Sequence, residues 1–297
     1  MAKPLAERMR RRLRRRVWAP FDAQVLGAIR GRRNARRDFT PVFVTGAMGS
    51  GTTLVALSLS QHFDFACVVT ESAREVAAAS PLHVPALEAF ESVDAYRRAI
   101  EASGGASGEQ ARRDLLTLYR RSASRPGRFA LDKGPNTNLV RAPLLARAFP
   151  DAHFVLVFRD PVVNVEGFRR KWPTFGRDPL EASIAFSAAI HEAFLAAAPA
   201  LGPRVIAVEY EALVADYDAQ LARVGRRLGL APATRPRALP ERGNYRGQGI
   251  RNVANGQIQL VTDANQAAYR GIAPDEAAAI RARLGPLHAR LRELAVR

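Results

Sequence analysis

A glycine-rich segment that could bind a phosphate or sulfate group follows a short apolar run near the start of the chain. Residues 46–53 read GAMGSGTT and join the run PVFVT to a helical pattern that begins at residue 52. Glycines let a backbone turn tightly around an anion, and the first amides of a helix add donors and a favourable dipole. The sequence therefore predicts an anion-binding loop, the alternative being a strand–helix turn without a ligand. Its candidate binding residues are Gly46, Gly49, Ser50, Gly51, Thr52 and Thr53.

The spacing of this loop is that of a P-loop, but Thr52 stands where a nucleotide kinase or NTPase has lysine. That lysine contacts the β- and γ-phosphates of the nucleotide. Asp160, which follows an apolar run, is no clear magnesium ligand because it lies between Arg159 and Pro161. Both observations argue against ordinary hydrolysis of ATP or GTP.

The elements that must position this loop alternate along the chain as apolar strands and helices. A strand that is apolar throughout is typical of a parallel sheet covered by helices on both faces. We therefore expect an α/β protein with a three-layer P-loop-like fold, a central parallel sheet and helical insertions near residues 66–125 and 172–200. The expected strands are 41–45, 128–131, 153–158 and 204–208, and the expected helices are 52–63, 142–149, 162–171, 180–198, 217–228 and 274–295.

Composition places the chain among globular proteins. Of its 297 residues 47% are hydrophobic and 25% are charged, which excludes wholesale disorder. Cys67 is the only cysteine and there are five scattered histidines, so neither a disulfide framework nor a metal site is expected. No stretch approaches the roughly 20 apolar residues that cross a bilayer. These features predict a protein of a reducing, cytoplasmic compartment.

Four stretches in order resemble the PAPS-dependent sulfotransferases, PAPS being 3′-phosphoadenosine 5′-phosphosulfate. They span about residues 41–231 and read FVTGAMGSGTTL, FALDKGPNTNLV, PDAHFVLVFRDPVVNVEGFRRKW and RVIAVEYEALVADYDAQLARVGRRLGL. The resemblance is to the carbohydrate and tyrosylprotein branch and its bacterial relatives, since Leu54 stands where the small-phenol branch has tryptophan. The high content of alanine and arginine is typical of a bacterial source of high GC content.

The resemblance implies a donor with two anionic groups and hence two anion sites. The loop would bind the 5′-phosphosulfate, and Arg159, at the end of a strand, would bind the 3′-phosphate. An ion pair with Asp160 or a neighbouring acid is the alternative for Arg159. The family has serine at the position of Gly167, so a second donor would come from the Gly167 amide, from Asn164 or from a later arginine.

The resemblance also implies which residues react. The family has a lysine or arginine facing the sulfuryl group at the position of Gly49, so another cation is needed there. Lys133 matches the lysine of the family's K-x-P segment and is the first candidate, unless it is a surface lysine at a turn. Glu71 falls within one residue of the family's general base; the alternative is an acid that stabilises a helix N-terminus. Glu75 and His83 are the fallback bases.

A late loop rich in glycine and arginine resembles the family's basic loop over the 3′-phosphate. It contains Arg242, Arg246 and Arg251. A flexible basic surface loop is the alternative. The family works without a metal ion, and none is expected here.

The first 37 residues hold most of the excess charge. They contain thirteen basic and two acidic residues, a net +11, whereas the other 260 residues carry +6. Leu5, Met9, Leu13 and Val17 recur at helical spacing among the arginines, which is typical of a basic helix on an anionic membrane surface. A solvated tail is the alternative, and nucleic acid is disfavoured because repeated aromatics are missing. We expect a basic tail at 1–38, one domain at 39–297, and a cytoplasmic protein peripheral to the inner membrane face.

Together these observations predict a PAPS-dependent sulfotransferase. It would move a sulfuryl group to a hydroxyl of a glycan, glycolipid or other small acceptor and release adenosine 3′,5′-bisphosphate. The basic tail favours an acceptor at a membrane face. The alternatives are a kinase-like P-loop protein that binds nucleotide, and a degenerate sulfotransferase fold that binds without turnover, which Gly49 and Gly167 suggest.

Overall fold

The computed structural model describes most of the chain as an alternating series of strands and helices. The described residues are 19–85, 90–104, 107–173, 175–176, 178–233, 253–254, 257–258 and 269–296. The strands are β1 (Thr40–Thr45), β2 (Cys67–Thr70), β3 (Phe129–Lys133), β4 (His153–Phe158), β5 (Val205–Glu209), β6 (Val253–Ala254) and β7 (Gln257–Ile258). The helices are α2 (Ala19–Arg33), α3 (Thr52–His62), α4 (Ser72–Glu75), α5 (Val93–Gly104), α6 (Gly108–Ser122), α7 (Thr137–Val140), α8 (Ala142–Ala148), α9 (Pro161–Lys171), α10 (Pro179–Leu201), the short 3-10 turn η3 (Gly202–Arg204), α11 (Tyr210–Ala215), α12 (Tyr217–Leu228) and α14 (Pro274–Val296).

The first five strands form one parallel sheet in the order β2-β3-β1-β4-β5. β1 lies at its centre between β3 and β4, with Val44 beside Lys133 and Thr45 beside Leu156. Because the strands are parallel, their carboxyl ends meet at one edge of the sheet. The segments that follow β1, β3 and β4 therefore lie side by side.

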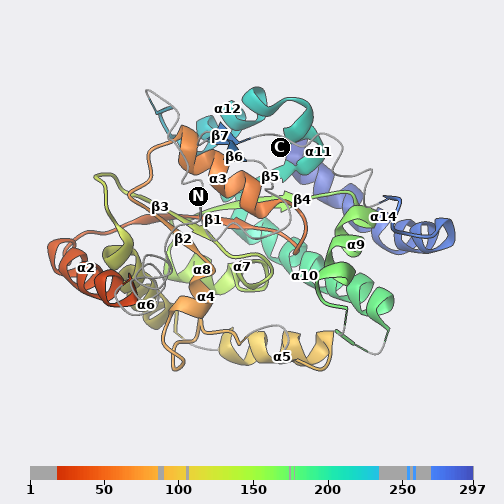
Figure 1. Ribbon diagram of the computed structural model, residues 1–297, viewed down its shortest axis with the longest axis horizontal. Helices are drawn as coiled ribbons and strands as arrows, with labels where there is room; N and C mark the ends of the chain where they lie inside the picture. The colour runs from red at the N-terminus through yellow and green to blue at the C-terminus, as the bar shows by residue number, and fades with distance from the viewer. Residues whose placement is uncertain are drawn as a thin grey trace, which may run out of the picture.

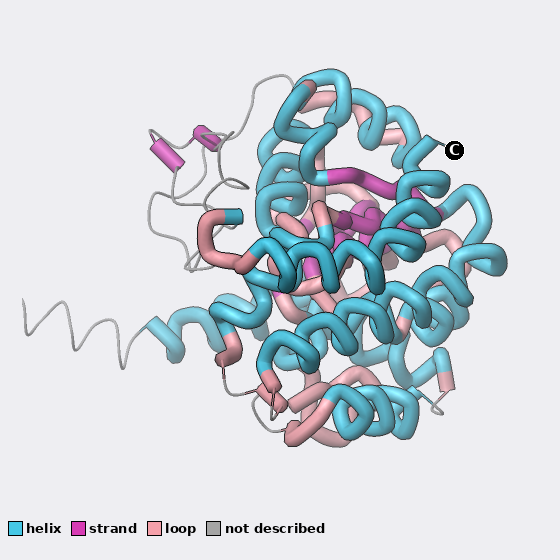
Figure 2. The backbone as a smooth tube through the Cα atoms, turned by 90° about the vertical axis from the view of Figure 1, so that its right-hand side faces the viewer, coloured by secondary structure: helices cyan, strands magenta, loops and turns pink. Residues whose placement is uncertain are grey.

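Helices cover both faces of the sheet (Figures 1 and 2). On one face α3, α11 and α12 pack on Val42, Val44 and other apolar residues of the central strands. On the other face α6, α8, α9, α10 and α14 enclose a larger core around Phe43, Phe154 and Phe158. The predicted three-layer α/β fold is confirmed.

The four predicted strands are present and the edge strand β2 was missed. Its sequence CVVT is only four residues long and its side chains alternate between buried and exposed, with Val68 42% exposed. A continuous apolar run marks a central strand, whereas an edge strand with one open face lacks that signal.

α10 also departs from the sequence expectation. It lies in the one helix, Pro179–Arg204, that among the described residues is long and apolar enough to cross a bilayer. Half of its most apolar window is buried in the protein, and α10 packs against α8, α9 and α14. The core helix of a soluble protein has the same composition, so this helix alone is weak support for a membrane span.

Part of the segment predicted as a basic tail is attached to the domain. α2 lies along α6 at the left end of the molecule in Figure 1. The Asn34 side chain donates to the carbonyls of Arg120 and Ala123, and Arg37 donates to the carbonyl of Gly127. Residues 1–18 lie outside the described part of the chain, and the boundary at residue 38 stays a prediction.

Candidate functional site

The glycine-rich loop lies between the end of β1 and the start of α3. A Cβ at Gly46 would overlap the carbonyl oxygen of Val157, and a Cβ at Gly51 would overlap the ring of Tyr210. Gly51 also has φ +98°, a conformation that other residues rarely adopt. Only glycine fits at either position, so the backbone makes the tight cradle that the sequence predicts.

The loop and the first turn of α3 also contain polar side chains. The Ser50 hydroxyl is fully buried and has no hydrogen-bond partner among the described residues. Thr52 is buried at the first turn of α3, Thr53 is half-buried, and the first amides of a helix have no partner within it. A buried hydroxyl beside a helix N-terminus fits an anionic ligand group.

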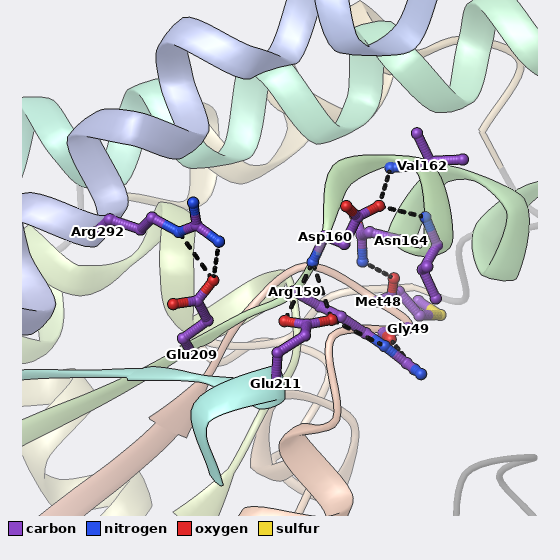
Figure 3. A network of polar contacts seen from close by, with 10 residues as sticks. Met48, Gly49, Arg159, Asp160, Val162, Asn164, Glu209, Glu211 and Arg292 are labelled. Atoms are coloured by element: carbon purple, nitrogen blue, oxygen red, sulfur yellow. Dashed lines mark hydrogen bonds and ion pairs between the residues drawn. The ribbon is translucent and has the colours of Figure 1, made fainter. Parts of the chain in front are cut away.

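Two asparagines hold the tip of the loop through the backbone of Met48. The Met48 amide donates to Oδ1 of Asn136 at 2.8 Å. Nδ2 of Asn164 donates to the Met48 carbonyl at 2.8 Å, as Figure 3 shows. The Asn136 amide also donates to the carbonyl of Gly46 at 3.0 Å. The sequence analysis missed Asn136, and its signal was the DKGPN segment after β3. Asn136 has φ +59°, which costs energy in a residue other than glycine.

Arg159 follows β4, as predicted, and its guanidinium lies beside the loop. Nη1 donates to the Gly49 carbonyl at 3.3 Å, and the guanidinium carbon lies 4.0 Å from the centre of the Tyr210 ring. Burial lowers the pKa of Arg159 and the nearby Tyr210 and Glu211 raise it, but arginine stays charged in either case. Tyr210 thus packs on both Gly51 and Arg159, a role that the sequence analysis missed.

Asp160 and Glu211 lie near Arg159, Glu209 lies at the end of the neighbouring β5, and each of these three carboxylates has a structural partner (Figure 3). Asp160 caps α9 by accepting from the amides of Val162 and Val163. Glu211 accepts from the Asp160 amide at 3.3 Å, and its Oε1 lies 3.9 Å from Nε of Arg159. Glu209 binds Arg292 of α14. The ion pair considered for Arg159 is therefore present, with Glu211 and at the outer limit of such a contact.

Glu71 and Lys133, the two predicted reacting residues, are brought together at the ends of β2 and β3. Nζ of Lys133 lies 3.5 Å from Oε1 of Glu71, and Arg74 lies 3.2 Å from Oε2. Burial lowers the pKa of Lys133 from its ordinary value, and Glu71 opposes that shift by favouring the charged amine. Glu71 has φ +57°, and its amide donates to the Lys133 carbonyl at 2.6 Å.

The fallback bases lie in the same segment. Glu75 is exposed at the end of α4. His83 is half-buried, and Arg141 donates to the carbonyls of His83 and Leu82, which fixes the backbone there. Of the acids in this segment, Glu71 has the contact with Lys133.

The two positions that depart from the family pattern face each other. A Cβ built on Gly167 would lie 3.9 Å from Cα of Gly49, and it meets nothing closer. Arg242, Arg246 and Arg251 lie outside the described residues. Within the described part of the chain, no group of three or more His, Cys, Asp and Glu residues could hold a metal ion.

A family model described as "Sulfotransferase family" matches residues 41–234. No curated protein matches the chain.

Solved structures share the fold at low identity. The sulfotransferase domain from the curacin biosynthetic pathway is 18% identical, with a TM-score of 0.53 over 84% of this chain and 98% of its own. The sulfotransferase domain of the Synechococcus PCC 7002 olefin synthase is 17% identical, with a TM-score of 0.51 over 82% of this chain and 94% of its own. Sulfotransferase STF1 from Mycobacterium tuberculosis H37Rv is 14% identical, with a TM-score of 0.50 over 88% of this chain and 81% of its own.

Proposed function

This chain belongs to the sulfotransferase family, and from that premise we propose that it transfers a sulfuryl group from PAPS to a hydroxyl group. The acceptor would be a glycan, a glycolipid or another small molecule, and the product of the donor would be adenosine 3′,5′-bisphosphate. One observation carries the proposal. The glycine-rich loop lies between the strand that ends in Lys133 and the strand that precedes Arg159, and Glu71 is 3.5 Å from Lys133.

The donor carries two anionic groups, and two separate groups of residues suit them. The glycine-rich loop, with the buried Ser50 hydroxyl beside Gly46 and the first amides of α3, suits the 5′-phosphosulfate. Arg159 suits the 3′-phosphate, since a guanidinium can hold a phosphate through two parallel hydrogen bonds. A nucleotide without a 3′-phosphate would use only the first group.

In the proposed reaction the acceptor oxygen attacks sulfur, and the bond from sulfur to the 5′-phosphate oxygen breaks. The attacking hydroxyl gives its proton to Glu71, and negative charge develops on the departing phosphate oxygen. Lys133 supplies a positive charge for that oxygen. Burial lowers the pKa of this amine, and the nearby Glu71 carboxylate opposes that shift.

The kinase-like alternative is not favoured by the site. Thr52 occupies the position of the P-loop lysine, and its hydroxyl brings no positive charge to a γ-phosphate. A degenerate fold that binds PAPS without turnover is the second alternative, because Gly49 offers no cation. Binding and turnover must therefore be measured separately.

Thermal unfolding with adenosine 3′,5′-bisphosphate, ATP or adenosine 5′-monophosphate at equal concentration tests the binding step. A ligand at about 100 times its Kd stabilises a protein by about 2.7 kcal/mol, which is a shift of several degrees in Tm. We expect a shift with the 3′,5′-bisphosphate alone. A shift with ATP alone would support the kinase reading.

Release of the bisphosphate from PAPS in the presence of candidate hydroxyl acceptors tests the chemistry. Glu71→Gln should keep donor binding and lose turnover by about a hundredfold or more, the usual contribution of a general base. Glu75→Gln removes the fallback base, an exposed acid four residues later, and should keep full turnover. Binding without turnover in the unmodified protein, across acceptors, would support the degenerate fold.

A further inference from the structure

The outward face of α2 combines exposed apolar and basic side chains. Leu26 is 48% exposed and Ile29 is 58% exposed, and they are two of the five exposed large apolar residues among the described ones. Arg30 and Arg33 are also exposed. At 100° per residue, positions 26, 29, 30 and 33 lie on one side of a helix.

The opposite side of α2 attaches the helix to the domain. A Cβ built on Gly31 would lie 3.3 Å from the Arg121 side chain of α6, so the helices approach closely there. Asn34, just after α2, donates to two carbonyls at the end of α6, and Nε of Arg120 donates to the carbonyl of Arg37 at 2.9 Å. The helix is therefore fixed with its apolar and basic side outward.

We infer that this outward face of α2 binds the surface of an anionic membrane. Its two apolar side chains suit insertion between lipid headgroups, and its arginines suit the headgroup charge. The sequence around it adds to the charge, since residues 26–37 contain five arginines and no acid. A nucleic acid would use the arginines but leave Leu26 and Ile29 exposed.

The chain connectivity places the end of α2 and the candidate site at opposite ends of the strands. α2 leads into the first residue of β1, whereas the glycine-rich loop follows its last residue. Six residues of strand separate the two by roughly 20 Å. The end of α2 therefore lies toward the amino ends of the strands, whereas the candidate site lies at their carboxyl ends.

Co-sedimentation of the full chain with vesicles tests this inference, and it needs neither donor nor acceptor. The vesicles are equimolar phosphatidylglycerol and phosphatidylcholine, or phosphatidylcholine alone, at near-physiological salt, where charges are screened beyond about 8 Å. We expect binding to the anionic vesicles only. Leu26→Ser/Ile29→Ser and Arg30→Glu/Arg33→Glu should each weaken it by about tenfold or more.

Arg226→Glu/Arg290→Glu makes the same change in net charge on exposed residues of α12 and α14 and is the matched control. It should keep binding within about twofold. All six residues are exposed, so equal melting temperatures would confirm that the variants fold. If Leu26→Ser/Ile29→Ser binds anionic vesicles as well as the unmodified chain does, the binding rests on charge attraction alone, as for any polyanion. That result would overturn the inference. So would no binding by the unmodified chain.

Discussion

At the scale of single residues, Gly49 and Gly167 are neighbours and must be understood together. A Cβ on Gly49 would lie 3.4 Å from the Asn164 carbonyl, which is tight, and Gly49 has φ +90°. A lysine or arginine there would be strained, so this loop conformation disfavours a cation at that position. Gly167 is different, because a Cβ there meets only the Cα of Gly49 at 3.9 Å.

Gly167→Ser should tighten binding of adenosine 3′,5′-bisphosphate. The new hydroxyl has room next to the loop, and a hydrogen bond to a charged group contributes about 1.5–3 kcal/mol. We expect a Kd about tenfold lower by isothermal titration calorimetry. The affinity for adenosine 5′-monophosphate should not change, because it has no 3′-phosphate.

Gly167→Ala is the control for this prediction. Replacing a helical glycine by alanine stabilises a helix by about 0.5–1 kcal/mol and adds no hydroxyl. Alanine should therefore raise Tm as serine does and leave the Kd unchanged. Equal Kd values for the two variants would show that the serine hydroxyl does not reach the phosphate.

At the scale of elements, α9 positions the loop as well as covering the sheet. Asp160 caps its first turn, and Asn164 lies one turn later on the side that faces Met48. Ser187 of α10 donates to Oδ1 of Asn164 at 3.2 Å and so orients its amide. The helix was predicted at 162–171 from its sequence, but the cap by Asp160 was not, and the contact to Met48 crosses 116 residues of sequence and leaves no local pattern.

Asn164→Ala should loosen the loop and weaken donor binding. It removes the hydrogen bond to the half-buried Met48 carbonyl, and an acceptor left without its partner costs up to about 1–3 kcal/mol. We expect the Kd for adenosine 3′,5′-bisphosphate to rise by about tenfold, measured by calorimetry. Unfolding by urea should show the loss of stability.

Ser187→Ala is the control that distinguishes the Asn164–Met48 hydrogen bond from other contacts of Asn164. It removes the bond to Asn164 Oδ1 but keeps the bond from Asn164 to Met48, so its Kd should rise by much less than that of Asn164→Ala. If both variants bind the bisphosphate with the same affinity, the contact to Met48 does not position the loop.

At the scale of the whole molecule, the sequence predicted the layers of the fold, and the structure brings two of the predicted site residues together. Alternation of apolar strands with helices is a local pattern, and so is the glycine-rich turn. Lys133 and Glu71 were selected by resemblance, and parallel pairing of β2 with β3 brings them together. The packing of Tyr210 and the strained backbone of Asn136 could not be predicted in this way, because both depend on segments distant in sequence.

The last described helix, α14, closes the fold and joins the site to the core. It packs on β5 and against α9 and α10, with Ile280, Leu284 and Leu291 buried. Arg292, near the end of α14, binds Glu209. The next residue, Tyr210, packs on Arg159. Either the buried leucines or the ion pair could hold α14 in place, and we expect them to contribute different amounts to the free energy of unfolding.

Leu284→Ala should lower the free energy of unfolding by about 2–5 kcal/mol, because it leaves a cavity at a side chain that is 2% exposed. Arg292→Ala should change it by less than about 1 kcal/mol, since the arginine is 60% exposed and such pairs are weak. Urea unfolding of the two variants measures both values. A larger loss for Arg292→Ala would mean that the ion pair with Glu209, rather than apolar packing, fixes α14 beside the candidate site.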